Sequence, residues 1–255
     1  LDIPANTQYN DCTFAVIIAN ENYQDVAKVP NALNDGTIFA EYCEKCLGLP
    51  SSNVRLVKDA TLNNIRREIN QLKQIAAAYN GEAKIIFYYT GHGIPDEATK
   101  NAYILPVDGY GNDFSTGYSL QDLYASLGTL QSKQVVVFLD ACFSGAKRGD
   151  GMLVSARGVS IKAKQNVPKG NMLVFSASQG DETAYSYDEK YHGLFTYYLL
   201  KKLKETKGEV PLGELSGFIK DNVIKKSIVV NGKSQTPTVA ASVSIANNWE
   251  NWTLK

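Results

Sequence analysis

The chain has 255 residues, of which 44% are hydrophobic, so it can bury one sizeable core and fits a single α/β domain. Its 26 basic and 26 acidic residues balance, which excludes a global charge that would recruit nucleic acid or an acidic membrane. No apolar run approaches the roughly 18 residues that cross a bilayer. We therefore expect a soluble protein without nucleic-acid or membrane partners, which recognises any partner at a local site.

The first residue and the cysteines bear on the cellular compartment. The chain begins with Leu1 rather than methionine, so we expect it to have been processed or cut from a longer precursor that carried any targeting segment. The four cysteines show no pairing pattern typical of a disulfide scaffold; they are Cys12, Cys43, Cys46 and Cys142. A cytoplasmic location and a secreted or periplasmic one both stay open, as does the oligomeric state.

Short runs of β-branched and aromatic residues recur along the chain and predict strands that are covered on both faces. In chain order, these runs cover residues 13–19, 54–57, 85–89, 135–139 and 172–175. Helices are expected at about 33–47, 61–79, 119–127, 193–206 and 211–225. Strand followed by helix, repeated, predicts right-handed crossovers and an α/β fold with a mostly parallel sheet and helices on both faces.

The stretch at 146–170 interrupts this alternation. It holds five glycine or proline residues and many basic ones, without a sustained hydrophobic period. Loops of this length are uncommon inside compact domains and are usually functional or disordered. We interpret the stretch as a long exposed loop that offers cleavage sites to a protease preferring basic residues.

Two strands end in segments that carry chemistry. TGHG follows the run at 85–89 and places His92 between glycines, and DACFSG follows the run at 135–139 and contains Cys142. Ligands of open parallel sheets bind beyond the carboxyl ends of the strands. A thiol with the ordinary pKa of about 8.5 needs a nearby base to act as a nucleophile. The sequence therefore predicts that His92 activates Cys142.

The glycine after the histidine suggests a further role. The backbone amides of Gly93 and Cys142 are expected to form an oxyanion hole for a tetrahedral intermediate. Each residue taken alone also fits a structural role, with Cys142 as a buried cysteine at a strand end and His92 as a loop histidine bonded to a carbonyl. The placement of both residues at the ends of predicted strands favours a catalytic role over these structural ones.

The motifs YYTGHG at 88–93 and FLDACFSG at 138–145 resemble those of the caspase, metacaspase and bacterial orthocaspase group. The histidine precedes the cysteine by 50 residues (142 − 92), as it does in caspases. The likeness extends over nearly the whole chain, including LPVDG at 105–109 and FSASQGDETAY at 175–185. The resemblance implies a cysteine endopeptidase that requires no cofactor.

The resemblance also implies the domain organisation. It indicates one caspase-like domain over residues 1–255, with a six-stranded, mostly parallel sheet. Residues 1–145 are similar to a large subunit, 146–170 form the exposed basic loop, and 171–255 are similar to a small subunit. Family members often cleave themselves between the two halves. The candidate processing sites in the loop are Lys147, Arg148, Arg157, Lys162 and Lys164.

The acidic residues near the motifs imply the specificity. True caspases have a basic pocket that selects aspartate, and a glutamine where this chain has Asp140. Asp35 aligns with the acidic pocket residue of metacaspases, so the resemblance implies that Asp35 and Asp140 bind an arginine or lysine of a peptide or protein substrate. Ser176 and Asp181 are further substrate-binding candidates. Alternatively, Asp35 serves a helix N-terminus, Asp140 ends its strand, and Asp181 is a solvated loop carboxylate.

Other residues of metal-binding or acid–base type are expected to be structural. Many metacaspases bind calcium through an acidic cluster, but this chain keeps Asp108 without the paired aspartates that should follow it, so a turn-forming role is expected and no metal is assigned. Cys43 and Cys46 have CxxC spacing without a second pair or a nearby histidine, which does not favour zinc or redox chemistry. His192 is expected at the surface or as a helix cap.

Two other functions stay open. Cys142 and Arg148 fit Cys-x5-Arg, the phosphate-cradling loop of cysteine phosphatases, although the glycines at 149 and 151 disfavour the helix that such a loop needs. The chain could also be an inactive relative that keeps the fold as a scaffold. Hydrolysis of peptides and of phosphate esters before and after replacement of Cys142 separates the three functions.

Overall fold

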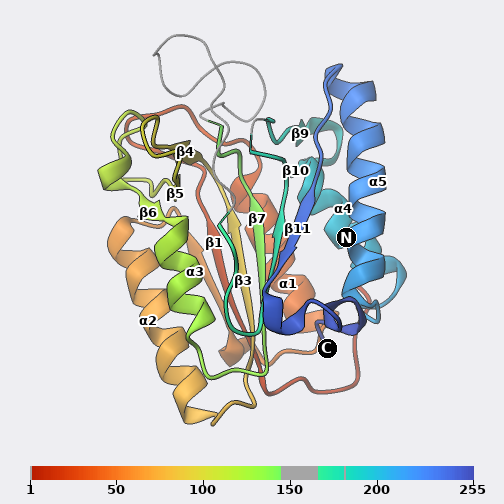
Figure 1. Cartoon of the computed structure of the whole chain (residues 1–255). Coiled ribbons are helices and arrows are strands. Elements are labelled where there is room, and N and C mark those ends of the chain that lie inside the picture. Colours follow the sequence, from red (N-terminus) through yellow and green to blue (C-terminus); the bar gives the residue numbers. More distant parts are fainter. Residues whose placement is uncertain (1, 145–165, 181) are drawn as a thin grey trace.

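The computed structural model describes residues 2–144, 166–180 and 182–255, and a six-stranded sheet lies at its centre (Figure 1). The strand order is β11-β8-β7-β3-β1-β2. The parallel strands are β1 (Thr13–Ala19), β2 (Val54–Lys58), β3 (Lys84–Thr90), β7 (Gln134–Asp140) and β8 (Met172–Ser176). Strand β11 (Thr238–Ala241) runs antiparallel to β8 at one edge.

Helices cover both faces of the sheet. They are α1 (Ala32–Lys45), α2 (Leu62–Ala78), α3 (Leu120–Gly128), α4 (Leu194–Glu205) and α5 (Leu212–Asn231). Helices α2 and α3 pack on one face, and α1, α4 and α5 pack on the other (Figure 1). The α/β fold expected from the sequence, with a mostly parallel six-stranded sheet between two helical layers, is confirmed.

Burial on both faces explains why the central strands are continuous apolar runs. Successive side chains of a strand point to opposite faces. On β3, Tyr88 therefore stacks on Phe39 of α1 with ring centroids 4.6 Å apart, while Tyr89 lies in the second core cluster with Ile65 of α2. The sheet consequently separates two hydrophobic cores, and both fix the position of the strands between them.

The predicted strands and helices all occur, with small differences in their ends, but α5 continues past the expected residue 225 to Asn231. Strand β11 and five strands of two or three residues were not predicted from the sequence. These are β4 (Gly93–Pro95), β5 (Ala102–Ile104) and β6 (Tyr118–Ser119), which form one sheet, and β9 (Ser186–Tyr187) with β10 (His192–Gly193), which form another. Such short strands cannot show a hydrophobic period.

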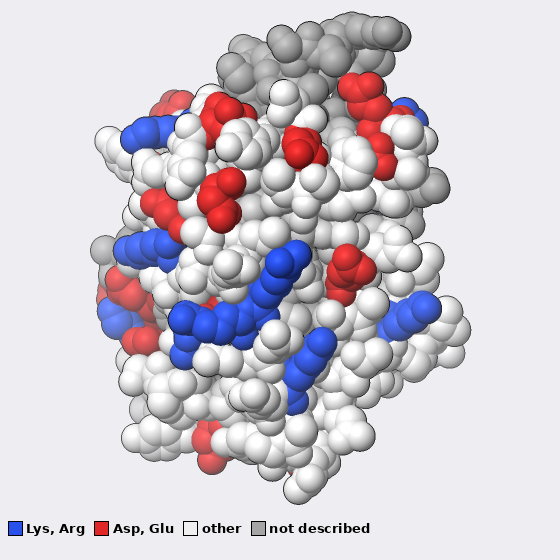
Figure 2. All heavy atoms as spheres, turned by 90° about the vertical axis from the view of Figure 1, so that its left-hand side faces the viewer, with Lys and Arg blue, Asp and Glu red and all other residues white. Residues whose placement is uncertain are grey.

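The molecular face formed by α2 and α3 carries charges of both signs. Figure 2 shows basic side chains across the middle of this face and most of the acidic ones above them. No single sign dominates this face, in keeping with equal numbers of acidic and basic residues in the chain. Among the described residues, no helix is long and apolar enough to span a membrane.

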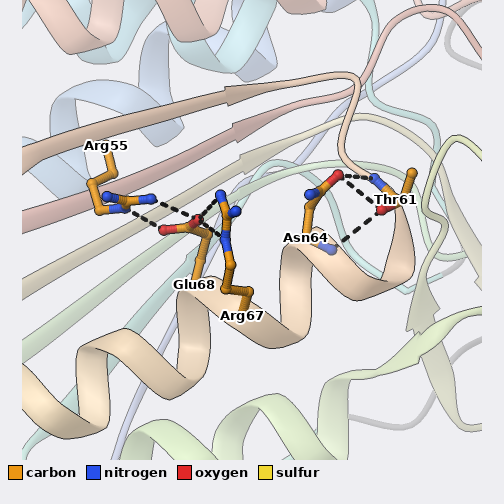
Figure 3. A network of polar contacts seen from close by, with 5 residues as sticks. All are labelled: Arg55, Thr61, Asn64, Arg67 and Glu68. Carbon is orange, nitrogen blue, oxygen red and sulfur yellow. Dashed lines mark hydrogen bonds and ion pairs between the residues drawn. The ribbon is translucent and has the colours of Figure 1, made fainter.

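A buried carboxylate joins α2 to β2. Glu68 on α2 is fully buried and accepts hydrogen bonds from Arg55 Nε on β2 at 2.5 Å and from Arg67 Nη2 at 3.0 Å (Figure 3). The same helix begins with a capping box, in which Thr61 and Asn64 each accept a backbone N–H of the other (Figure 3). These contacts fix α2 against the sheet edge.

Replacing Glu68 by glutamine is expected to destabilise the protein by about 2 kcal/mol at pH 7, because hydrogen bonds between charged groups are lost. Burial raises the pKa of Glu68, but hydrogen bonds from Arg55 and Arg67 outweigh burial and hold the pKa below its usual value. This stabilisation is complete above the unfolded pKa of about 4.3 and is lost as the pH falls through the lower folded pKa. Urea unfolding between pH 7 and pH 3 measures both effects.

The matched control is Glu41→Gln, which removes an exposed pair with Lys45 of the same helix. Exposed pairs spaced by four residues contribute only about 0.3–0.5 kcal/mol. An equal decrease in the free energy of unfolding for the two variants would contradict the role assigned to Glu68. So would a decrease in Glu68→Gln that stays the same at low pH.

Candidate active site

The register of β3 and β7 brings the two chemical segments to one edge of the sheet. The strands pair in parallel up to Thr90 and Asp140, and the N–H of Gly91 continues the pairing with a 3.4 Å bond to the carbonyl of Asp140. His92 and Cys142 each follow this pair of residues by two positions. The segments that carry the histidine and the cysteine therefore leave the sheet side by side.

Gly93 lets the two segments approach closely. A Cβ atom at Gly93 would lie 2.6 Å from the carbonyl oxygen of Cys142 and would overlap the ring of Phe143. Since real side chains do not tolerate such contacts, any larger residue would separate the two segments. This packing requirement accounts for the glycine, and the oxyanion-hole role of its amide stays a prediction.

The imidazole of His92 is buried and oriented by a backbone carbonyl. Its Nε2 lies 2.7 Å from the carbonyl oxygen of Ala27, and the side chain is only 3% exposed. A carbonyl oxygen can only accept a hydrogen bond, so Nε2 carries a proton in this contact. Nδ1 is then the ring nitrogen that can take up a proton in the neutral imidazole.

Two tyrosines fix the backbone of His92. Its N–H donates to the Tyr23 hydroxyl at 2.7 Å, and the Tyr89 hydroxyl donates to its carbonyl at 2.6 Å. The ring of Tyr23 also packs on the imidazole, with centroids 4.8 Å apart. A Cβ at Gly91 would overlap both hydroxyls, at 2.5 Å and 2.6 Å, so the glycine before the histidine makes room for this arrangement.

Cys142 lies under the segment that connects β8 to β9. Its side chain is 4% exposed, and the N–H of Ala184 donates to Sγ at 2.6 Å. The thiol lies 3.6 Å from the carbonyl oxygen of the same residue. The nucleophile candidate is therefore covered by a backbone group from the second half of the chain.

Asp35 is fully buried, and it contacts the start of α4. Its Oδ1 lies 2.6 Å from His192 Nδ1, and its Oδ2 accepts the N–H of Gly193 at 2.9 Å. His192 was expected at the surface or as a helix cap. The surface position is wrong, because His192 is only 5% exposed; the residue directly precedes Gly193, the N-cap of α4. The carboxylate explains this burial, since a buried imidazole needs a polar partner for its N–H group.

Asp140 contacts the same end of α4. Its carboxylate is fully buried, and Oδ2 accepts the Thr196 hydroxyl at 2.6 Å. Because Thr196 donates this bond, the Tyr88 hydroxyl at 2.6 Å from Thr196 Oγ1 must donate in turn. Asp35 and Asp140 thus both bond to residues at the N-terminus of one helix, where negative charge is favoured.

The structure describes only some of the other candidate residues. Ser176 ends β8 and, together with Phe143, lines a pocket of about 100 Å³. Asp181 lies outside the described residues. So do the candidate processing sites, which are Lys147, Arg148, Arg157, Lys162 and Lys164.

The residues of metal-binding type make the following contacts in the described part of the chain. Asp108 lies in a turn, and its Oδ1 accepts the N–H of Leu62 at the start of α2, at 3.0 Å. Cys43 and Cys46 are buried in the core around α1. Within residues 2–144, 166–180 and 182–255, no group of three or more His, Cys, Asp or Glu side chains could hold a metal ion.

A family model described as "Caspase domain" matches residues 12–246. This chain belongs to the caspase-domain family. Members of the family are cysteine peptidases, and the segments with His92 and Cys142 both lie within the matched region. A comparison with curated protein sequences gives no significant match.

Two solved structures show the same caspase-domain fold. Caspase-1 from Spodoptera frugiperda is 15% identical, with a TM-score of 0.64, over 94% of this chain and 91% of that one. A protein from Geobacter sulfurreducens is 17% identical, with a TM-score of 0.68, over 94% of this chain and 97% of that one. At these identities the likeness establishes the fold.

Sequence reasoning missed several residues that hold this caspase-domain site together. Ala27 and Ala184 contribute backbone groups, which any residue could supply, so no sequence signal marks them. Tyr89 fits an ordinary apolar strand, and its hydroxyl contact with His92 depends on the chain turning back at TGHG. The one signal was chemical, because a tyrosine buried in a strand needs a hydrogen-bond partner for its hydroxyl group.

Cys43 on α1 and Cys46, which directly follows that helix, are expected to resist alkylation at pH 7. Burial raises the pKa of Cys46 to about 11 and also raises that of Cys43. Only the thiolate reacts, so at four pH units below its pKa about one Cys46 thiol in 10⁴ is reactive. Peptide mass mapping after iodoacetamide treatment should find Cys12, which is exposed, labelled before Cys43 or Cys46.

The same treatment in urea serves as the control, since unfolding exposes every thiol and should label all of them. Labelling of Cys43 or Cys46 in the folded protein as fast as Cys12 would show that this CxxC pair is accessible and chemically active.

Proposed function

We propose that this chain is a cysteine endopeptidase that hydrolyses peptide bonds after arginine or lysine, with Cys142 as the nucleophile and His92 as the general base. The register pairing of Thr90 with Asp140 carries the proposal, because it delivers a histidine and a cysteine to adjacent strand ends. Membership of a family of cysteine peptidases supports the reaction class.

The contacts of His92 suggest how the proton moves. With Nε2–H bonded to the carbonyl of Ala27, Nδ1 takes the proton from Cys142 Sγ. The thiolate forms a bond to the substrate carbonyl carbon, and the amides of Gly93 and Cys142 donate to the resulting oxyanion. The C–N bond then breaks as His92 gives its proton to the leaving amine. Water, deprotonated by His92, hydrolyses the thioester and restores the thiol.

The burial of Cys142 adds a requirement to this mechanism. Its side chain is only 4% exposed, and the backbone of Ala184 contacts Sγ. A peptide carbonyl therefore reaches the thiol only when neighbouring residues move aside. In this proposal, the movement that uncovers Cys142 precedes the chemical reaction. Substrate binding has to supply the free energy for that movement.

The proposed specificity rests on two buried carboxylates. Asp35 and Asp140 both bond to the first residues of α4, so their negative charges lie near one another at a helix N-terminus. An arginine or lysine side chain would gain charge-assisted hydrogen bonds from such a pair.

Peptides that differ only in the residue before the scissile bond test this function. We expect cleavage of the arginine and lysine peptides and little cleavage of the aspartate peptide. The Cys142→Ala variant should lose at least about 10³-fold of this activity, since removing a nucleophile removes the covalent route. Fluorogenic peptides give the rates, and circular dichroism checks that the variant is folded.

Each other outcome points to a different conclusion. A preference for aspartate would reject the acidic pocket but keep the roles of Cys142 and His92. Absence of cleavage by the unmodified chain would favour a scaffold without activity. Phosphate-ester hydrolysis that disappears in Cys142→Ala would favour the Cys-x5-Arg reaction.

Self-cleavage follows from the same specificity. We expect incubated protein to yield two fragments separated after a basic residue of the 146–170 stretch, the candidates being Lys147, Arg148, Arg157, Lys162 and Lys164. Intact-mass spectrometry identifies the bond, and Cys142→Ala should remain a single chain. A single intact chain after long incubation, with peptide activity present, would reject self-processing.

A further inference from the structure

The segment between β8 and β9, described here at residues 177–180 and 182–185, contacts the candidate nucleophile. Ala184 donates its N–H to Cys142 Sγ at 2.6 Å, and the carbonyl of Glu182 accepts the Ser144 hydroxyl at 3.3 Å. The segment therefore contacts both the thiol and the residue two positions after it. The position of the Ala184 N–H group depends on what holds this segment in place.

Gln235 bonds to both ends of the segment. This side chain is fully buried, its Oε1 accepts the N–H of Tyr185 at 2.9 Å, and its Nε2 donates to the carbonyl of Ala177 at 2.9 Å. The backbone N–H of Gln235 donates to Ser227 Oγ on α5, also at 2.9 Å. One amide side chain thus ties the segment to α5 and to the residues that precede β11.

Thr236, the next residue, holds the middle of the segment. Its N–H donates to Glu182 Oε2 at 2.5 Å, and its hydroxyl donates to Glu182 Oε1 at 2.9 Å. Glu182 is also the residue whose carbonyl accepts the Ser144 hydroxyl. Gln235 and Thr236 together fix the segment at three places, and the Tyr185 contact lies directly beside Ala184.

We propose that Gln235 is a positioning residue for the nucleophile, which keeps the Ala184 N–H group on Cys142 Sγ and thereby stabilises the thiolate. A hydrogen bond to a charged acceptor is roughly twice as strong as one to a neutral acceptor, so this donor favours the ionised sulfur over the thiol. The catalytic meaning of this role rests on the peptidase function proposed above. The stabilisation of the Cys142 thiolate does not depend on that function.

Among the described residues, the titratable groups near Cys142 include Asp140 at the end of β7, His92 after β3, and Glu182 in the segment itself. None of them is substituted in the test of Gln235. The glutamine side chain carries no charge, so its replacement is expected to act on the thiol through the backbone that it bonds at Ala177 and Tyr185. A shift in the titration of Cys142 then reports the position of the Ala184 donor.

The test compares Gln235→Leu with Gln134→Leu in a chain in which the exposed Cys12 is replaced by serine. Gln134 is the matched control, because it is a buried glutamine that donates to a carbonyl, that of Thr253, at 2.9 Å. It lies at the other end of β7, away from the site. The rate of Cys142 alkylation by iodoacetamide is measured from pH 5 to pH 10 by mass spectrometry.

The pH midpoint of alkylation reports thiolate formation, whereas the limiting rate at high pH reports access to the buried sulfur. In Gln235→Leu we expect the midpoint to rise by about one unit, which slows alkylation about tenfold at pH 7. Gln134→Leu should keep the wild-type midpoint despite a similar loss of stability. The kcat of Gln235→Leu for a basic peptide should fall by a similar factor at pH 7 and recover at higher pH.

An unchanged or lower midpoint in Gln235→Leu, or equal shifts in both variants, would overturn the proposal. If Gln235→Leu does not fold, Ser227→Ala decides, because it removes the acceptor of the Gln235 N–H group and, besides that, only the bond from the Ser227 hydroxyl to the carbonyl of Ile224 within α5. A smaller rise of the midpoint is expected there, and no rise would reject the role. A raised midpoint in a chain without peptidase activity would reject the proposed function and keep the positioning role.

Discussion

The parallel pairing of β3 with β7 is the constraint on which the rest of the site depends. A shift of register by one residue would turn every side chain of a strand to the opposite face. Both faces are buried here, with Tyr88 packed in one core and Tyr89 in the other, so either direction of slip would disrupt both cores. The packing that stabilises the sheet therefore also determines that His92 and Cys142 emerge side by side.

The central strands and the two reactive residues could be predicted because they leave strong local signals. Apolar runs reveal buried strands, and a histidine among glycines at a strand end indicates chemistry. The remainder of the site is built from backbone groups and from contacts distant in sequence. The carbonyl of Ala27 and the N–H of Ala184 look like any others in a sequence, and Gln235 bonds to Tyr185 across 50 residues. His192 was misplaced for a related reason, because a polar residue is expected at the surface unless its buried partner, here Asp35, is known.

The side chains of Asp35, Asp140 and Cys142 bond mainly to residues of the second half of the chain. Their described polar contacts thus join the two halves on either side of the 146–170 stretch. Asp35 bonds to His192, Asp140 bonds to Thr196, and Cys142 bonds to Ala184. A buried carboxylate without partners would cost several kcal/mol. Neither half alone could therefore hold these groups inside the protein, and the pocket proposed for a basic side chain exists only when α4 is packed against the strands that precede it.

This arrangement gives a physical reason why a cut within the 146–170 stretch is compatible with an intact site. Strands β7 and β8 lie on opposite sides of that stretch and pair over five positions, from Val135 with Met172 to Leu139 with Ser176. Both hydrophobic cores also contain residues from the two halves. These contacts do not need a continuous backbone between Ser144 and the start of β8, so we expect them to hold the sheet and the candidate site together after such a cut.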